Sequence, residues 1–383
     1  MKASLHITSI KKGLKYPLLF GIIGTFMGVV LRYAFTGAIS EFPFKYVIHS
    51  HSHVLLLGFL FNALLLLVWT HFTDGIDKVS YKYYMALQGC VVLFMIAFIL
   101  QGYAFYSILF STLHLWISYI LVIRLWKRLS GDKAMQRLIK IGILFHFTAS
   151  LGPYMLGPLM AMKMHASPWY QQAIFFYLHF QYFGVFFVWM LAVLLQKTAI
   201  KPTKKDSIVI GGSLVLLFAH SLDYSFDHWL IQVLGAVGSI ALLLVLLQFA
   251  KHFIKTQKAY RYIYYSTLLV AITNIVGSIP SMANLVIGNR FLLIAWLHLL
   301  FLGMYTPFIW VAIQKRIPPL VWFLYGSFLL FSETILIFPM LSQWLSISVM
   351  WLLFWGYLGV FLCICFVHIK FLLEKEASGI QPY

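Results

Sequence analysis

Acidic residues are scarce in this sequence, which contains 10 Asp and Glu among 383 residues. Charged residues of all kinds make up only 10% of the chain, against about a quarter in an ordinary soluble domain. Hydrophobic residues make up 62% and aromatic residues 18%. This balance excludes a soluble globular enzyme and indicates an integral membrane protein.

Cysteine is also rare, and its three copies are Cys90, Cys363 and Cys365. Each lies in an apolar segment, and their spacing fits neither a disulfide framework nor a zinc ribbon. The sequence also lacks a P-loop, a glycine-rich dinucleotide turn and a G-x-S-x-G nucleophile motif. No internal repeat is evident. The common nucleotide-dependent and hydrolase classes are therefore excluded.

Long apolar runs recur along the whole chain instead. Each has about 20 residues, which is enough to cross a hydrocarbon core of about 30 Å. No connecting loop is long enough to fold alone, so we expect an all-α protein with residues 1–383 forming a single transmembrane domain. Twelve spans are predicted, at residues 16–36, 51–70, 84–103, 106–125, 139–160, 171–196, 207–222, 228–250, 262–287, 291–313, 319–340 and 346–369.

Basic residues fall almost entirely in alternate loops and at the two ends of the chain. Of the 28 Lys and Arg residues, the exceptions are Arg32, Lys45, Lys163 and Arg290. By the positive-inside rule this asymmetry predicts that both termini are cytoplasmic, in a multi-pass protein of a bacterial inner membrane. The net charge of +18 therefore indicates contact with anionic lipid headgroups of the bilayer rather than with nucleic acid.

Histidines occur inside or at the edge of these apolar segments. An imidazole in hydrocarbon is costly, and it is usually kept for a metal, a haem or a proton path. The alternative for a single residue is a hydrogen bond between two helices. Their places in the predicted topology put them in the outer half of the membrane, which predicts a metal centre there. The histidines concerned are His51, His53, His114, His179, His220 and His298.

Two of these segments resemble those of subunit I of the haem–copper oxidase and nitric oxide reductase superfamily. The segment beginning His51-Ser-His53 is similar to the one carrying the first axial ligand of the low-spin haem. The segment Ala295-Trp-Leu-His298 is similar to the Ala-His-x-His motif that ends in the second ligand. The resemblance implies a low-spin, bis-histidine haem b held by His298 and by His51, with His53 as the alternative. His49 and His53 share a helix face, and His51 lies on roughly the opposite face.

Two further segments resemble the copper-binding part of the same superfamily. His179 stands where the first copper-ligating histidine is expected, and His220 stands in the family's Ala-His-His segment. The resemblance implies a second metal, copper, at these two residues. Two positions depart from the family pattern. Trp296 replaces the ligand of the high-spin haem, and Ser221 replaces the third copper ligand.

A second resemblance is to the NnrS-type membrane proteins, which also have twelve helices and bind haem and copper. The similarity rests on His51-Ser-His53, on the following pair Gly58-Phe59 and on a chain shorter than a full oxidase. Either resemblance implies respiratory electron transfer, or the handling of oxygen or nitric oxide. The expected electron donor is a cytochrome c-type protein or another respiratory subunit. Oxidoreductase activity of the terminal-oxidase kind stays open, because the high-spin ligand is replaced.

Arg32 and Arg290 are almost the only cations expected on the outer side. A guanidinium binds a carboxylate through two parallel hydrogen bonds, so these residues are predicted to hold the haem propionates. Alternatively, they are interfacial cations whose stems lie along apolar surface.

The rival hypotheses need no cofactor. In one, the protein is a transporter or proton relay, a class that often uses broken helices such as those expected at Pro153, Pro158, Pro280 and Pro307. In the other, it is an assembly subunit of a respiratory complex. A visible spectrum of the purified protein distinguishes both from a haem protein.

Overall fold

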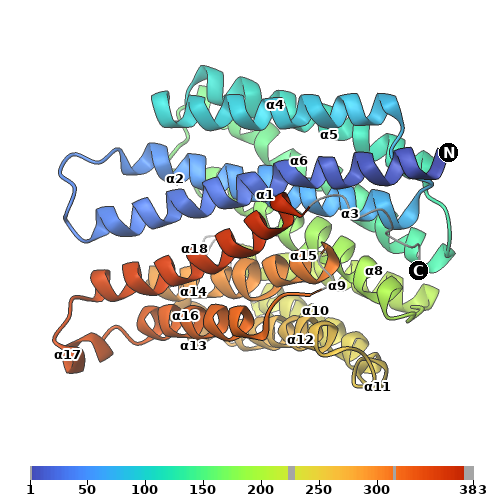
Figure 1. Ribbon diagram of the computed structural model, residues 1–383. Helices are drawn as coiled ribbons and strands as arrows, with labels where there is room; N and C mark the ends of the chain where they lie inside the picture. The colour runs from blue at the N-terminus through green and yellow to red at the C-terminus, as the bar shows by residue number, and fades with distance from the viewer. Residues whose placement is uncertain (1, 223–228, 314–315, 375–383) are drawn as a thin grey trace. The chain divides into compact units, whose positions relative to one another are not determined.

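The computed structural model describes residues 2–222, 229–313 and 316–374, and it is drawn in Figure 1. Every regular element in these ranges is a helix, which confirms the predicted all-α class. The chain divides into two compact units. Unit 1 contains Met1–Leu125 and Ile294–Tyr383, and unit 2 contains Trp126–Leu293. A single domain over residues 1–383 stays a prediction.

Unit 1 is built from an N-terminal and a C-terminal group of helices. The N-terminal group is α1 (Lys2–Phe35), α2 (Phe44–His53), η1 (Val54–Phe61), α3 (Asn62–Phe72), α4 (Lys78–Gln101) and most of α5 (Phe105–Arg128). The C-terminal group is most of α14 (Arg290–His298), then η5 (Leu299–Tyr305), α15 (Thr306–Ile313), α16 (Pro319–Ile337), α17 (Leu341–Leu345) and α18 (Val349–Leu373).

Unit 2 is also wholly helical in its described part. Its elements are α6 (Lys133–Ala161), α7 (Pro168–His179), η2 (Phe180–Phe187), α8 (Val188–Lys197), α9 (Lys204–Leu216), η3 (Leu217–Ser221), α10 (Trp229–Gln248), α11 (Ala250–Phe253), α12 (Lys258–Gly277) and α13 (Pro280–Gly288). The segments η1, η2 and η5 are π-helical and continue the preceding α-helix without a break, whereas η3 is a 3-10 turn.

Ten helices of the described chain are long and apolar enough to cross a membrane. An eleventh span is possible at Lys258–Gly277 with Pro280–Val286, where the two helices meet at a bend of 106°. The predicted span 207–222 corresponds to α9, which has 13 residues and continues into the 3-10 turn η3. By the length and composition of its helices, the chain is a multi-pass integral membrane protein.

The most buried span of each unit carries one of the predicted site histidines. In unit 1 this span is Phe44–Phe72, which contains His51 and His53 and has an apolar window of 18 residues that is 83% buried. In unit 2 it is Pro168–Lys197, which contains His179 and has an apolar window of 18 residues that is 89% buried. Each unit therefore surrounds a histidine-bearing helix with other helices, and these outer helices expose apolar side chains.

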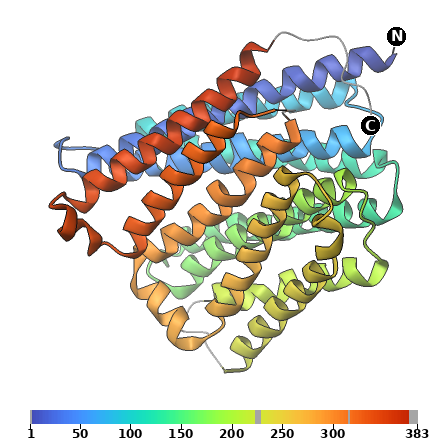
Figure 2. The same cartoon turned by 60° about the horizontal axis from the view of Figure 1, so that its bottom comes forward.

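Helix α1 packs closely along α18 because glycines line the contact. A Cβ atom at Gly28 would lie 2.5 Å from the hydroxyl oxygen of Tyr357, and one at Gly21 would lie 2.6 Å from Cε1 of His368. The earlier residue of α1 meets the later residue of α18, so the two helices are antiparallel, as Figures 1 and 2 show. Small residues allow this close approach, which is a common basis of helix association in membranes.

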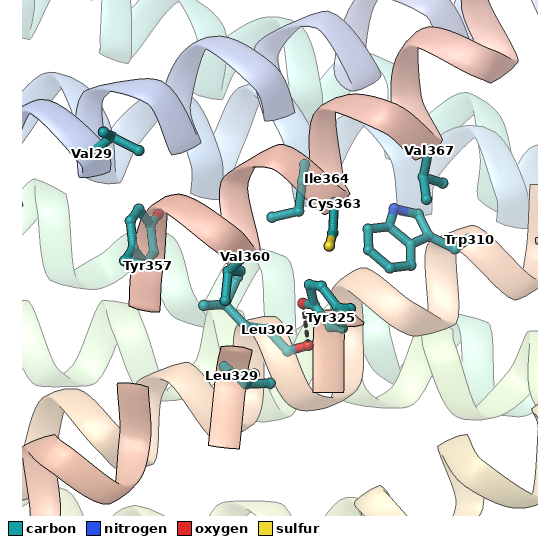
Figure 3. Close-up of a cluster of buried hydrophobic side chains, with 10 residues drawn as sticks. All are labelled: Val29, Leu302, Trp310, Tyr325, Leu329, Tyr357, Val360, Cys363, Ile364 and Val367. Carbon is teal, nitrogen blue, oxygen red and sulfur yellow. Dashed lines mark hydrogen bonds between the residues drawn. The ribbon is translucent and has the colours of Figure 1, made fainter. Parts of the chain in front are cut away.

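A cluster of buried hydrophobic side chains joins α18 to α16, η5 and α15 (Figure 3). Trp310 and Tyr325 are among its largest members, with ring centroids 4.8 Å apart. The hydroxyl of Tyr325 donates a hydrogen bond of 2.7 Å to the carbonyl oxygen of Leu302, which belongs to the π-helix η5. This bond ties α16 to the π-helical segment that follows His298.

Candidate functional site

Three of the spans change from α-helix to π-helix directly after a histidine. In each of them a glycine follows that histidine by five positions. The three pairs are His53 and Gly58, His179 and Gly184, and His298 and Gly303. The same His-x4-Gly spacing therefore recurs in three spans. Short π-helical segments within α-helices are rare and occur frequently at functional sites.

The repeated glycines allow neighbouring side chains to approach the π-helical turns. A Cβ atom at Gly58 would lie 2.8 Å from Cγ1 of Val91, and one at Gly184 would lie 2.7 Å from Cβ of Phe145. Only a residue without a side chain fits at these distances. Each of these two histidine-bearing helices is thereby held close to a neighbouring helix.

The ring of His51 is oriented by the backbone of α1. Its Nδ1 lies 2.8 Å from the carbonyl oxygen of Gly24. Since a carbonyl only accepts hydrogen bonds, Nδ1 carries the hydrogen and Nε2 keeps its lone pair. No hydrogen bond engages Nε2 within the described ranges. His51 therefore presents a nitrogen in the form that binds metals.

The ring of His298 is oriented by a carboxylate on α16. Its Nδ1 lies 2.9 Å from Oε1 of Glu333, and the two side chains are 20% and 14% exposed. The pairing directs Nδ1 to the carboxylate, and Nε2 has no hydrogen-bond partner in the part of the chain that the structure describes. A histidine fixed at Nδ1 by a carboxylate is the usual arrangement of a metal ligand.

The two rings belong to one cluster in unit 1. His51 interacts electrostatically with His298 and with Arg32. The guanidinium carbon of Arg32 is 6.0 Å from the ring centroid of Tyr357. The same Tyr357 ring is nearly parallel to that of His298, at 6.2 Å between centroids and an interplanar angle of 26°. The predicted ligands and one predicted propionate contact are thus assembled by α1, α2, α14 and α18.

His53 lies in a different environment from His51. Its Nδ1 donates to the carbonyl oxygen of His49 in the same helix, at 2.9 Å. Its ring packs against Phe98, with centroids 4.4 Å apart, and against Tyr103 at 5.9 Å. His49 contacts the same Tyr103 ring, at 5.3 Å. These contacts separate His53 from the Arg32 cluster, so the geometry favours His51 among the alternatives left open by the sequence.

Arg290 begins α14 and is exposed. It belongs to unit 2, whereas the histidine cluster belongs to unit 1. A contact between Arg290 and a haem propionate stays a prediction.

The predicted copper residues His179 and His220 both lie in unit 2, within electrostatic range of each other. Nε2 of His179 donates to the carbonyl oxygen of Leu214 at 2.8 Å. Nε2 of His220 is 2.9 Å from Oγ of Ser278. The same hydroxyl lies 3.1 Å from the backbone carbonyl oxygen of Asn274. Both rings therefore use Nε2 to bind protein groups.

Ser221 lies beside His179, with its Oγ 3.5 Å from Nδ1 of that ring. Ser221 stands at the position of the third copper ligand in the resemblance. It is thus a neighbour of His179, which stands at the position of the first. Among residues 2–222, 229–313 and 316–374, no group of three or more His, Cys, Asp or Glu side chains is arranged to hold a metal ion. Copper at His179 and His220 stays a prediction.

His114 and His146 are buried in different units. In unit 1, the ring of His114 packs between Phe61 and Phe94, with centroids 6.0 and 5.9 Å away. In unit 2, the ring centroid of His146 lies 6.4 Å from that of Phe147. These contacts fit helix packing, which was the alternative weighed for an intramembrane histidine.

Three members of the cluster were not predicted as site residues. Glu333 had a usable signal, because an acidic residue within an apolar span is functional by default. Gly24 contributes a backbone carbonyl, which no side-chain motif reveals. Tyr357 is one of 22 tyrosines, and its sequence context does not distinguish it from the rest.

No protein-family model matches the chain, and no curated protein matches it significantly. The site is therefore interpreted from its own geometry.

Proposed function

We propose that this protein binds a low-spin haem b between His51 and His298, as its resemblance to subunit I of haem–copper oxidases and nitric oxide reductases implies. The supporting observation is the chemistry of the donor pair. The two imidazoles lie in one cluster, each donates from Nδ1 to a fixed acceptor, and each keeps a lone pair on Nε2. A low-spin haem uses two such axial nitrogens.

The other residues of the cluster also fit a haem. Arg32 adds a guanidinium, which suits a propionate carboxylate. Tyr357 adds an aromatic wall beside His298. Two ligands are enough for this cofactor, because the porphyrin supplies the remaining donors to the iron.

A bound haem supplies a one-electron couple at this position in the membrane. The protein's own residues then orient the ligands and exclude water from them. We assign the protein to respiratory electron transfer, or to the handling of nitric oxide or oxygen, in a bacterial inner membrane. A cytochrome c-type protein or another respiratory subunit is the proposed donor. Trp296 in place of the high-spin ligand favours electron transfer over oxygen reduction.

The test is a reduced-minus-oxidised spectrum of the purified, haem-supplemented protein with iron analysis. We expect a Soret band and a low-spin spectrum. His298→Ala removes that spectrum, whereas the buried but differently placed His114→Ala retains it. His51→Ala and His53→Ala, compared in the same way, identify the second ligand. Wild-type protein without a Soret band and without iron contradicts the proposal.

We also propose that the chain crosses the membrane twelve times, with both termini cytoplasmic. Helices lie at all twelve predicted positions when α9 and the bent pair α12–α13 are included. If α9 did not cross, the basic loop with Lys251, Lys255 and Lys258 would be outside, against the positive-inside rule. Residues 375–383, at the C-terminus, lie outside the described residues.

Thiol labelling with a membrane-impermeant reagent in intact cells tests this topology. We expect Lys163→Cys to be labelled from outside and Lys255→Cys to be protected. Labelling of Lys255→Cys would show that α9 does not cross.

A cofactor-free transporter is the second candidate. The observation that favours it is the bend of 106° between α12 and α13, since transporters commonly use interrupted helices at their substrate sites. A purified protein that lacks haem but moves protons or solutes in vesicles would support this alternative.

A further inference from the structure

Glu333 is an acidic side chain inside a membrane-spanning helix, and it contacts one of the two proposed haem ligands. It is the sole Asp or Glu in the sequence of α16. Its side chain is only 14% exposed. A carboxylate in hydrocarbon is costly and is therefore normally paired or functional.

The two oxygens of this carboxylate have different surroundings. Oε1 accepts the hydrogen bond of 2.9 Å from Nδ1 of His298. Oε2 is buried and makes no hydrogen bond within the described ranges. Arg32 lies within electrostatic range and provides a compensating positive charge. The imidazole of His298 is thus the direct hydrogen-bond partner of Glu333.

The two proposed ligands consequently have acceptors of different strength. His51 donates to the neutral backbone carbonyl of Gly24, whereas His298 donates to the carboxylate of Glu333. Hydrogen bonds to an ionised acceptor are roughly twice as strong as neutral ones. The ring of His298 is therefore the more electron-rich of the two.

We propose that Glu333 is a positioning residue that acts on the haem iron through His298. The proposal rests on the haem site proposed above. The carboxylate holds the hydrogen on Nδ1, keeps Nε2 directed away from Glu333 and raises the basicity of the ligand. A more basic axial ligand stabilises ferric iron relative to ferrous iron. Glu333 therefore lowers the reduction potential of the haem, since hydrogen bonding to the ligand shell is one of the protein's means of setting it.

A redox titration of haem-loaded wild-type protein and of Glu333→Gln tests this role. The amide still accepts a hydrogen bond from Nδ1 but carries no charge. We expect the low-spin spectrum to persist and the midpoint potential to rise by about 59 mV, a tenfold change in a one-electron equilibrium constant. Glu41→Gln makes the same charge change in the exposed loop between α1 and α2, and it should leave the potential unchanged.

The outcomes separate this role from haem binding itself. Wild-type protein that binds no haem contradicts the proposed function. Haem-loaded Glu333→Gln with the wild-type potential overturns only the role of Glu333. If Glu333→Gln does not retain haem, haem retention by Glu333→Asp is measured instead. Haem retained by the aspartate variant supports a requirement for a carboxylate, and haem lost from it overturns the proposed role.

Discussion

The two histidine pairs of this protein differ in which ring nitrogen the protein uses. In unit 1, His51 and His298 are both held at Nδ1, and their Nε2 atoms have no hydrogen-bond partner in the described part of the chain. In unit 2, His179 donates from Nε2 to a backbone carbonyl, and Nε2 of His220 pairs with the hydroxyl of Ser278. A histidine within a span is therefore not sufficient evidence of a ligand. What distinguishes the two pairs is the ring nitrogen that the protein engages, which is Nδ1 in unit 1 and Nε2 in unit 2.

Replacing one histidine in each unit should give the largest difference between the two histidine pairs. His51→Ala is expected to abolish the low-spin haem spectrum, because an axial ligand is lost. His179→Ala should retain the spectrum but destabilise the protein by about 1–3 kcal/mol, because the carbonyl of Leu214 loses its buried donor. Spectra and thermal unfolding in detergent measure the two effects. Loss of haem from His179→Ala would place the cofactor in unit 2 instead.

The repeated glycines provide the next largest expected effect. Gly58→Ala and Gly184→Ala each add a Cβ atom too close to a neighbouring side chain, and each should cost about 1–3 kcal/mol of stability. Only Gly58→Ala should also reduce haem content, since it lies in the span of His51. Gly89→Ala and Gly212→Ala are the controls, because a Cβ atom at either position meets nothing within 4 Å. Equal haem loss in both π-helical variants would contradict the distinction between the units.

Two buried tyrosine hydroxyls offer a smaller, matched comparison. Tyr325 donates to the carbonyl of Leu302 in unit 1, and Tyr264 donates to that of Leu246 in unit 2. Replacement of either by Phe should cost about 0.5–1.5 kcal/mol of stability. Tyr325→Phe should also weaken haem binding, because Leu302 lies in the π-helix that follows His298. Haem titration of both variants would detect this, and identical affinities would limit Tyr325 to a structural role.

The smallest effect is expected at the surface ion pair between Asp132, which precedes α6, and Lys201, which lies between α8 and α9. A hydrogen bond from Lys201, at 3.0 Å, is the main cause that lowers the pKa of Asp132 below its ordinary value. Its stabilising contribution is thus present above the ordinary pKa of an aspartate and is lost as the pH falls through the lowered value. Lys201→Ala should slightly reduce the melting temperature at neutral pH and much less in acid. An equal decrease at both pH values would show that the charge of Asp132 is not involved.

Some of the candidate site could be predicted from sequence because its ligands are chemically unusual for their surroundings. His51 and His298 are imidazoles in apolar segments, and this contrast is visible without coordinates. The π-helical turns were not predictable, because they arise from a shift in backbone hydrogen bonding that leaves the apolar pattern unchanged. The resemblance favoured His51 over His53, but the residues alone left the choice open, because two positions on one helix differ only in which neighbouring helices surround them.

The sequence alone determined that this chain is an all-helical, multi-pass membrane protein. Apolar length and the scarcity of charge dictate that outcome before any packing is considered. Only the tertiary structure decided that Glu333 and Gly24 fix the two histidine rings, and that the ring nitrogens in unit 2 are used differently. The physical reason is that hydrogen bonds between helices join residues far apart in the chain, and their partners are selected by packing rather than by local pattern.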